Sequence, residues 1–165
     1  MAAADVSAVN AINPAGTPGD VLVLRRLIDA PRDVVFAVWS DPLHVAEWWQ
    51  PAGYTTPVFE MDFHVGGGFR YCIRKEGRDG WARGAYREIV PPSRIVFTFQ
   101  WQSGDLAHDS ETLVTVTFES QAERTLLTFR QEPFSSNESR HSHGLGWNQV
   151  LESFESFVVK QRESS

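Results

Sequence analysis

The spacing of the apolar residues changes near position 133, and this change limits what the chain can fold into. From residue 54 up to that point apolar and polar side chains alternate, whereas afterwards apolar residues recur every three or four positions. A period of two is typical of strands with one buried face, and a period near 3.6 is typical of an amphipathic helix. The alternating part predicts six strands in an antiparallel meander, at 54–65, 69–76, 81–90, 94–101, 112–120 and 124–132.

Short turn sequences separate these runs. The stretch 77–80, GRDG, predicts a hairpin turn that contains Asp79-Gly80. Three glycines at 66–68 predict a bend between strands, because neither the Lys-Ser/Thr pair of a phosphate loop nor a helix follows them.

Three further elements precede the meander. Residues 20–29 are rich in Val, Leu and Ile and predict a first strand. Two short helices are expected next, over 31–39 with proline in the first turn and over 41–49 with Asp41 as the N-cap.

The last element is a long helix, expected over about 136–160. Two glycines, Gly144 and Gly146, each cost roughly 1 kcal/mol in a helix interior, so a start near Gly146 stays open as an alternative to a start near Ser136. His141 lies about 200° from His143 around such a helix, which disfavours a shared metal. Its buried stripe is expected to consist of His143, Trp147, Val150, Leu151, Phe154, Phe157 and Val158.

This order of elements predicts an α+β fold in which a curved antiparallel sheet of about seven strands wraps around the terminal helix, a helix grip. Residues 1–18 predict a flexible tail, and residues 19–162 predict a single domain. The chain has six Trp and eleven Phe. So many rings indicate either a wide core or a cavity lined with them.

Composition excludes several classes of function. The net charge is −6 and no basic run is present, which disfavours nucleic acid and anionic membranes as partners. Cys72 is the only cysteine, so no disulfide or cysteine-based zinc cluster is expected. No window approaches a membrane span, and the first residues do not resemble a signal peptide. The expected location is the cytoplasm.

Four stretches resemble one known family when they are taken in order: RRLIDAPRDVVFAVWSDPLHVAEWWQP, GGGFRYCIR, GAYREIVPPSRIVFTFQW and HGLGWNQVLESF. Together they are similar to the activator-of-Hsp90-ATPase-like (AHSA-like) proteins of the START-like, or SRPBCC, helix-grip superfamily, which also contains polyketide cyclases. The resemblance covers about residues 20–161. It implies a cavity between sheet and terminal helix that holds apolar small molecules, and the family name implies a link to chaperones and the stress response.

The cavity implied by the resemblance would be lined by aromatic side chains from the sheet, the second short helix and the terminal helix. Arg26, Arg70 and Glu88 are candidate polar members, and the sequence leaves open which way they face. The expected ligand-binding residues are Trp49, Tyr71, Tyr86, Phe97, Phe99, Trp101, Phe118, Phe129, His143 and Trp147.

Three functions follow as hypotheses. The first is a non-catalytic or weakly catalytic module that binds a hydrophobic small molecule, with no cofactor and no metal. The second is a cyclase- or dehydrase-type enzyme in which His143 moves protons and Tyr71, Tyr86 or Arg70 polarises a carbonyl. The third is a protein-interaction module, a homodimer or a chaperone partner, with Trp48 and Trp49 as exposed anchors.

Metal binding has only weak candidates. His64 with Glu60 or Asp62, and His108 with Asp109, are pairs without the third convergent ligand that zinc sites use.

Overall fold

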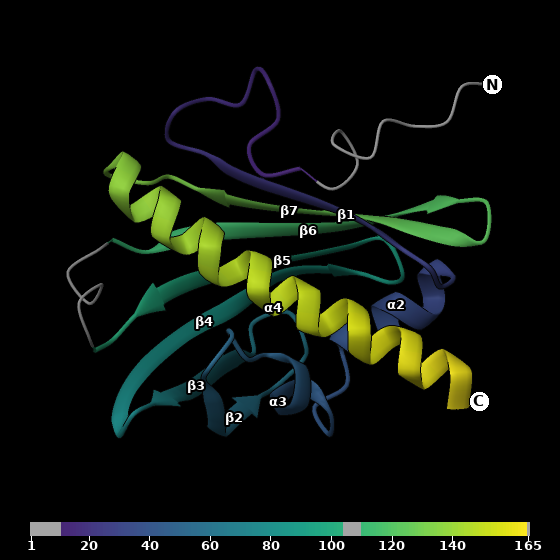
Figure 1. Ribbon diagram of the computed structural model, residues 1–165, viewed down its shortest axis with the longest axis horizontal. Helices are drawn as coiled ribbons and strands as arrows, with labels where there is room; N and C mark the ends of the chain where they lie inside the picture. Colours follow the sequence, from purple (N-terminus) through teal and green to yellow (C-terminus); the bar gives the residue numbers. More distant parts are fainter. Residues whose placement is uncertain (1–10, 104–109, 165) are drawn as a thin grey trace.

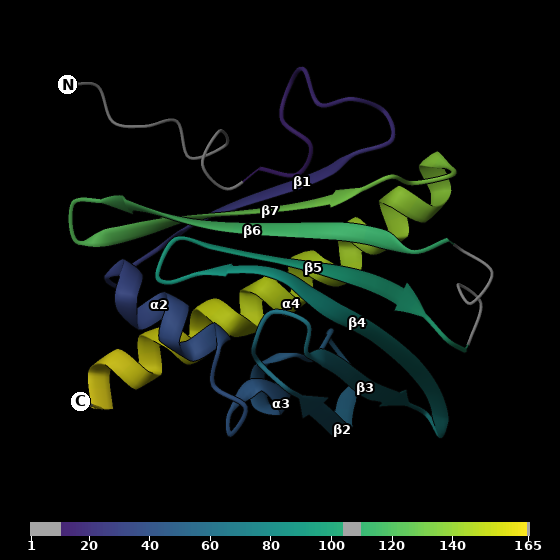
Figure 2. The same ribbon diagram turned by 180° about the vertical axis from the view of Figure 1, so that it is seen from behind.

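The structure is a computed structural model, which describes residues 11–103 and 110–164. Seven strands form one antiparallel sheet in the order β1-β7-β6-β5-β4-β3-β2, and the helix α4 (Asn137–Ser164) crosses its concave face (Figure 1). Seen from behind, the sheet covers that helix (Figure 2). This is the helix-grip fold that the sequence predicts. The strands are β1 (Leu22–Ile28), β2 (Thr55–Met61), β3 (Gly68–Lys75), β4 (Arg78–Val90), β5 (Arg94–Trp101), β6 (Thr112–Gln121) and β7 (Arg124–Glu132).

Close packing between strands helps the sheet to curve. A Cβ on Gly84 of β4 would lie 1.8 Å from the Thr98 carbonyl oxygen and 2.5 Å from the Phe69 ring. Only glycine leaves room for that ring against the backbone. Further along β4 the pairing with β5 shifts between Tyr86 and Glu88, and such a bulge bends the strand.

The hairpin between β3 and β4 turns earlier than the sequence predicts. Glu76 and Gly77 form the turn, with φ of 52° and 76°, as a two-residue turn of this hand requires. Asp79 and Gly80, which were expected in the turn, pair within the ladder with Arg74 and Ile73. The prediction was wrong because it followed the local turn preference of Asp-Gly, whereas the pairing of β3 with β4 places the turn at Glu76-Gly77 and holds Glu76 at a positive φ that this residue type rarely adopts.

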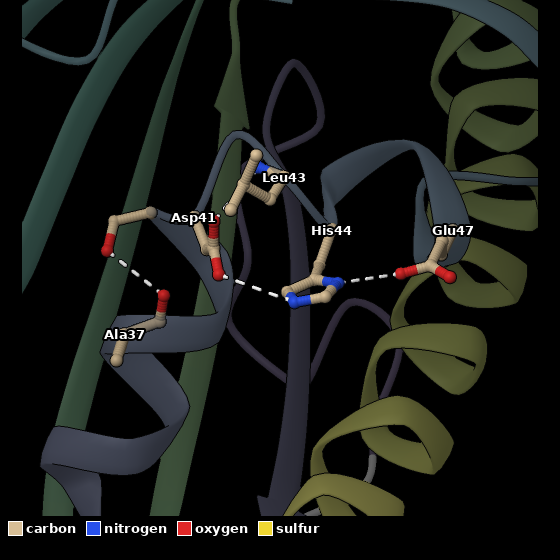
Figure 3. Close-up of polar contacts among 6 residues, drawn as sticks. Ala37, Asp41, Leu43, His44 and Glu47 are labelled. Carbon is tan, nitrogen blue, oxygen red and sulfur yellow. Dashed lines mark hydrogen bonds and ion pairs between the residues drawn. The ribbon is translucent and has the colours of Figure 1, made fainter.

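The two short helices follow β1 as expected, but the second is shorter than predicted. α2 spans Arg32–Trp39, and α3 spans only Val45–Trp48. The Asp41 carboxylate accepts a hydrogen bond from the Leu43 amide at 2.9 Å, so it stabilises a tight turn ahead of α3 instead of capping it. His44 lies between Asp41 and Glu47, with its Nδ1 at 2.8 Å from the Glu47 carboxylate (Figure 3).

The terminal helix begins at the earlier of the two positions left open. The Ser136 hydroxyl accepts the Ser139 amide at 3.0 Å, which is an N-cap bond. The predicted stripe is confirmed, since every member is buried except Phe157, which is partly buried.

The C-terminal half of α4 is fixed by an aromatic cluster from α2 and α3, which lie beside it in Figure 1. Phe154 is fully buried, and its ring centre lies 5.1 Å from that of Trp39 and 4.6 Å from that of Trp48. Next to this cluster, Arg26 of β1 forms an ion pair with Glu155 at 2.8 Å.

Part of the predicted N-terminal tail lies within the described residues. The Asn13 amide donates to the Val23 carbonyl oxygen at 2.7 Å, and Ile12 forms a bridge with Leu24, so residues 11–13 lie along the free edge of β1. Within the described ranges no helix is both long and apolar enough to cross a membrane.

Replacing Phe154 with alanine should lower the free energy of unfolding by about 3–5 kcal/mol, because the change leaves a cavity between two tryptophans. Urea denaturation followed by circular dichroism measures this. Phe157→Ala, one turn along and only partly buried, is the control and should cost less than half as much. Equal losses would contradict the view that Phe154 anchors the helix.

Candidate functional site

Three neighbouring pockets border the N-terminal half of α4 in the described part of the chain. The inner recess, about 70 Å³, is lined by Trp49, Tyr71, Trp101, His143, Gly146 and Trp147, among others. The outer groove, about 640 Å³, continues from it toward solvent. The end pocket, about 230 Å³, lies on the other side of His143, against Phe99, Thr112 and Phe134. Trp101 borders all three.

Glycine spacing on α4 makes room for the inner recess. A Cβ on Gly144 would meet Leu22 of β1 at 3.2 Å, whereas a Cβ on Gly146 would meet nothing within 4 Å. Gly144 therefore lets the helix approach β1, and Gly146 leaves open space over the recess. Ser142, one turn before Gly146 on the same helix, borders both the inner recess and the outer groove.

His143 holds Trp101 in place. The Trp101 indole N–H donates to Nε2 of His143 at 3.1 Å, and Nδ1 of His143 lies 2.8 Å from the carbonyl oxygen of Ser139. An indole nitrogen only donates and a carbonyl only accepts, so this pairing keeps the imidazole proton on Nδ1. Both ring nitrogens bond to protein groups, and the geometry fits a positioning role better than proton transfer to a ligand.

A second polar chain ties α4 to the sheet beneath the recess. The Trp147 indole donates to Oε1 of Gln131 at 2.8 Å, and Nε2 of Gln131 donates to the Thr112 hydroxyl at 2.8 Å. That hydroxyl donates to the Phe99 carbonyl at 3.1 Å. Gln131 is fully buried, so these bonds satisfy groups that would otherwise be costly to bury.

Two buried tyrosines lie on the concave face. Burial raises the pKa of the Tyr71 phenol, and the Trp49 indole, which donates to that phenol, acts in the opposite direction. Burial also raises the pKa of Tyr86, with a smaller contribution from the charge of Asp62. Both phenols are therefore neutral at ordinary pH.

The structure separates the ten predicted ligand residues into two groups. Six of them border the pockets described above: Trp49, Tyr71, Phe99, Trp101, His143 and Trp147. The other four, Tyr86, Phe97, Phe118 and Phe129, are buried in the core and line none of these pockets. The aromatic side chains thus fill most of the concave face, and the pockets that the predicted ligand residues border lie near the start of α4.

The three polar candidates do not reach the recess. Arg26 lies on the concave face, but its Nη2 donates to the Asn148 side chain at 3.1 Å in addition to the Glu155 pair. The Arg70 guanidinium lies 4.0 Å from the centre of the Trp81 ring on the convex face. Glu88 pairs there with Arg94 at 3.4 Å.

Several residues of the site were not predicted. Three of them line the outer groove with polar side chains: Lys75, Arg78 and Ser142. The fourth, Gln131, lies beneath the recess and accepts the hydrogen bond from Trp147. A signal for Gln131 and Lys75 exists in the sequence, because each continues the inward alternation of its strand. The GLG stretch around Gly146 gave a partial signal, since glycine in a helix allows close approach.

The metal candidates are not brought together. His64 forms an ion pair with Asp62 at 2.7 Å on the surface. In residues 11–103 and 110–164 no group of three or more His, Cys, Asp or Glu side chains is placed to hold a metal ion. His108 and Asp109 lie outside the described residues.

Comparison with known proteins identifies relatives of this fold. Residues 29–158 match the family described as Activator of Hsp90 ATPase homolog 1-like protein. Among proteins with a curated description, no match was found.

Solved structures agree with the family match. A protein of Chromobacterium violaceum is 28% identical with a TM-score of 0.76, covering 86% of this chain and 98% of that one. The solution structure of an Arthrobacter aurescens protein is 21% identical with a TM-score of 0.78, covering 92% of each chain. The AHSA1 protein of Silicibacter pomeroyi is 22% identical with a TM-score of 0.75, covering 86% of this chain and 99% of that one.

Raising the pH above about 10 should destabilise the protein through Tyr71 and Tyr86. Their folded pKa values lie above those of the unfolded chain, so the folded state keeps protons that the unfolded state releases, and stability falls as pH rises. The slope should approach roughly 1 kcal/mol per pH unit for each phenol.

Tyr86→Phe should keep most of the stability at neutral pH and make the alkaline loss shallower. Urea denaturation at a series of pH values between 8 and 12 measures this, with phenolate absorbance followed in parallel. An unchanged alkaline slope in this variant would contradict the assignment to Tyr86.

Proposed function

This chain belongs to the Activator of Hsp90 ATPase homolog 1-like family, and we propose that it binds a hydrophobic small molecule where the inner recess opens into the outer groove. In general terms, the family and the fold support a ligand-binding or interaction module. The proposal adds the site, the kind of ligand and the absence of catalysis.

Continuity between the recess and the groove carries this proposal. Ile73, Trp101 and Gly146 border both spaces, so an apolar group can pass from one to the other over an apolar floor. The groove falls within the range of about 300–1,000 Å³ that is typical of small-molecule sites. The recess alone is smaller than the roughly 150 Å³ cavity that accepts benzene, so a ring needs both spaces together.

The expected affinity is weak. Burying about 200 Å² of apolar ligand surface contributes about 5 kcal/mol at 25 cal/mol per Å². Immobilising the ligand offsets part of this gain, and a Kd on the order of 1 mM follows.

The other two hypotheses gain less support from the geometry. An enzyme of the cyclase type requires a free base, whereas both nitrogens of His143 bond to Trp101 and Ser139. A protein interface anchored on Trp48 and Trp49 requires exposed rings, whereas these residues are 0% and 4% exposed. For the location of the chain we retain the cytoplasm, which imaging of the tagged chain would test.

Gly146→Leu should abolish binding of a neutral aromatic ketone such as 2-acetonaphthone while keeping the fold. The new side chain enters open space, so it fills the mouth of the recess without striking the backbone. Replacing this glycine with leucine also favours the helical conformation by up to about 1 kcal/mol. Quenching of tryptophan fluorescence measures binding, because Trp49, Trp101 and Trp147 line the recess.

His141→Leu is the matched control, since it adds the same side chain to an exposed position of the same helix. It should bind the ketone as the wild type does. Unchanged binding in Gly146→Leu would place the ligand elsewhere, and no saturable binding to the wild type would overturn the proposed function.

A further inference from the structure

Two basic side chains stand opposite each other at the rim of the outer groove. Lys75 ends β3, Arg78 begins β4, and the two are register partners across the turn. Alternation along β3 places Lys75 on the same face as Tyr71 and Ile73, which is the concave face. Both basic residues line the groove.

The oppositely charged pair of this hairpin lies on the other face. Arg74 donates from Nε and Nη2 to the two carboxylate oxygens of Asp79, at 2.6 and 3.1 Å. The hydrogen bond from Arg74 lowers the pKa of the Asp79 carboxyl. Although Asp79 also borders the groove, its charge is already balanced by Arg74.

The positive charges of Lys75 and Arg78 are not neutralised in this way. Within the described ranges neither forms an ion pair, and the carboxylate of the intervening Glu76, which also borders the groove, pairs with neither. The Lys75 ammonium lies 5.3 Å from the centre of the Tyr54 ring, a cation–π contact that holds it beside the groove without neutralising it. Like charges directly opposite each other on a sheet are unfavourable, so an anion bound between them would stabilise the hairpin.

We propose that the ligand of this protein carries a carboxylate, which Lys75 and Arg78 bind at the rim while the apolar body lies over Ile73 and Trp101. This inference rests on the proposed function, because the apolar body needs the recess and the groove. The ligand class is thus a small amphipathic carboxylic acid with an aromatic or branched apolar body.

The residue types favour a carboxylate over other head groups. An arginine guanidinium presents paired donors that match the two oxygens of a carboxylate, and a lysine adds a point charge that adjusts to the ligand. A cationic head group would be repelled by both residues. A neutral ligand would leave both cations without an anion.

Matched ligands test this directly. The carboxylate 2-naphthoate and the ketone 2-acetonaphthone have nearly the same shape and differ mainly in charge. Calorimetry at low salt should give about fivefold tighter binding of the naphthoate, the effect expected of two solvent-exposed ion pairs. Near 1 M salt, where such pairs are screened, the preference should disappear.

Substitutions test whether Lys75 and Arg78 cause the preference for naphthoate over the ketone. Lys75→Met and Arg78→Gln should each lower the ratio of naphthoate affinity to ketone affinity from about fivefold to about twofold, because one of the two ion pairs remains. Lys75→Arg should keep the full ratio. Arg83→Gln is the control for the loss of one positive charge. Arg83 is an exposed residue of β4, the strand that also contains Arg78, but it lies on the convex face. Thermal denaturation of each variant checks that the fold is retained.

The outcomes separate the two proposals. If the wild type binds both ligands equally, or if Arg83→Gln reduces the naphthoate preference as much as Lys75→Met, the carboxylate inference fails and the proposed function stands. If the wild type binds neither ligand, the proposed function fails and the inference falls with it.

Discussion

The packing of Phe154 against Trp39 and Trp48 fixes how far α4 can stand from the sheet, and the site depends on that distance. At this end the helix packs onto buried rings that border none of the three pockets at its other end. At the other end Gly146 contributes no side chain, and the space above Tyr71 and Trp101 stays open. The same helix therefore closes the core with one half and shapes a pocket with the other.

Two polar chains keep the open end from collapsing. The Trp101–His143 bond and the Trp147–Gln131 bond each hold an indole at the wall of the recess. A tryptophan without its partner would lose a hydrogen bond in a buried place, so rotation of either ring into the recess carries a cost. The recess is thus maintained by directional bonds as well as by the shape of its apolar walls.

Much of this architecture could be predicted from periodicity. The strand runs and the stripe on α4 from His143 to Val158 are long repeats with a single buried face, and such repeats are robust to local variation. Periodicity could not predict which inward-facing residues are buried in the core and which border a pocket. Phe97 and Phe99 occupy equivalent positions on β5, yet only Phe99 borders one of the three pockets. Phe99 lies against the rings of His143 and Trp147 on α4, whereas the rings around Phe97 come from other elements. These neighbours are far apart in the sequence.

The charge of the groove depends on a still finer detail, the position of one turn. With a turn at Asp79-Gly80, as the sequence predicted, Asp79 would sit in the loop and the pairing of the basic residues would be different. The observed turn at Glu76-Gly77 sets Arg74 opposite Asp79 and Lys75 opposite Arg78. Because side chains alternate between faces, the neutralised pair lies on the convex side and the two cations lie together on the concave side. The choice of turn residues thus determines which charges a ligand at the mouth of this cavity encounters.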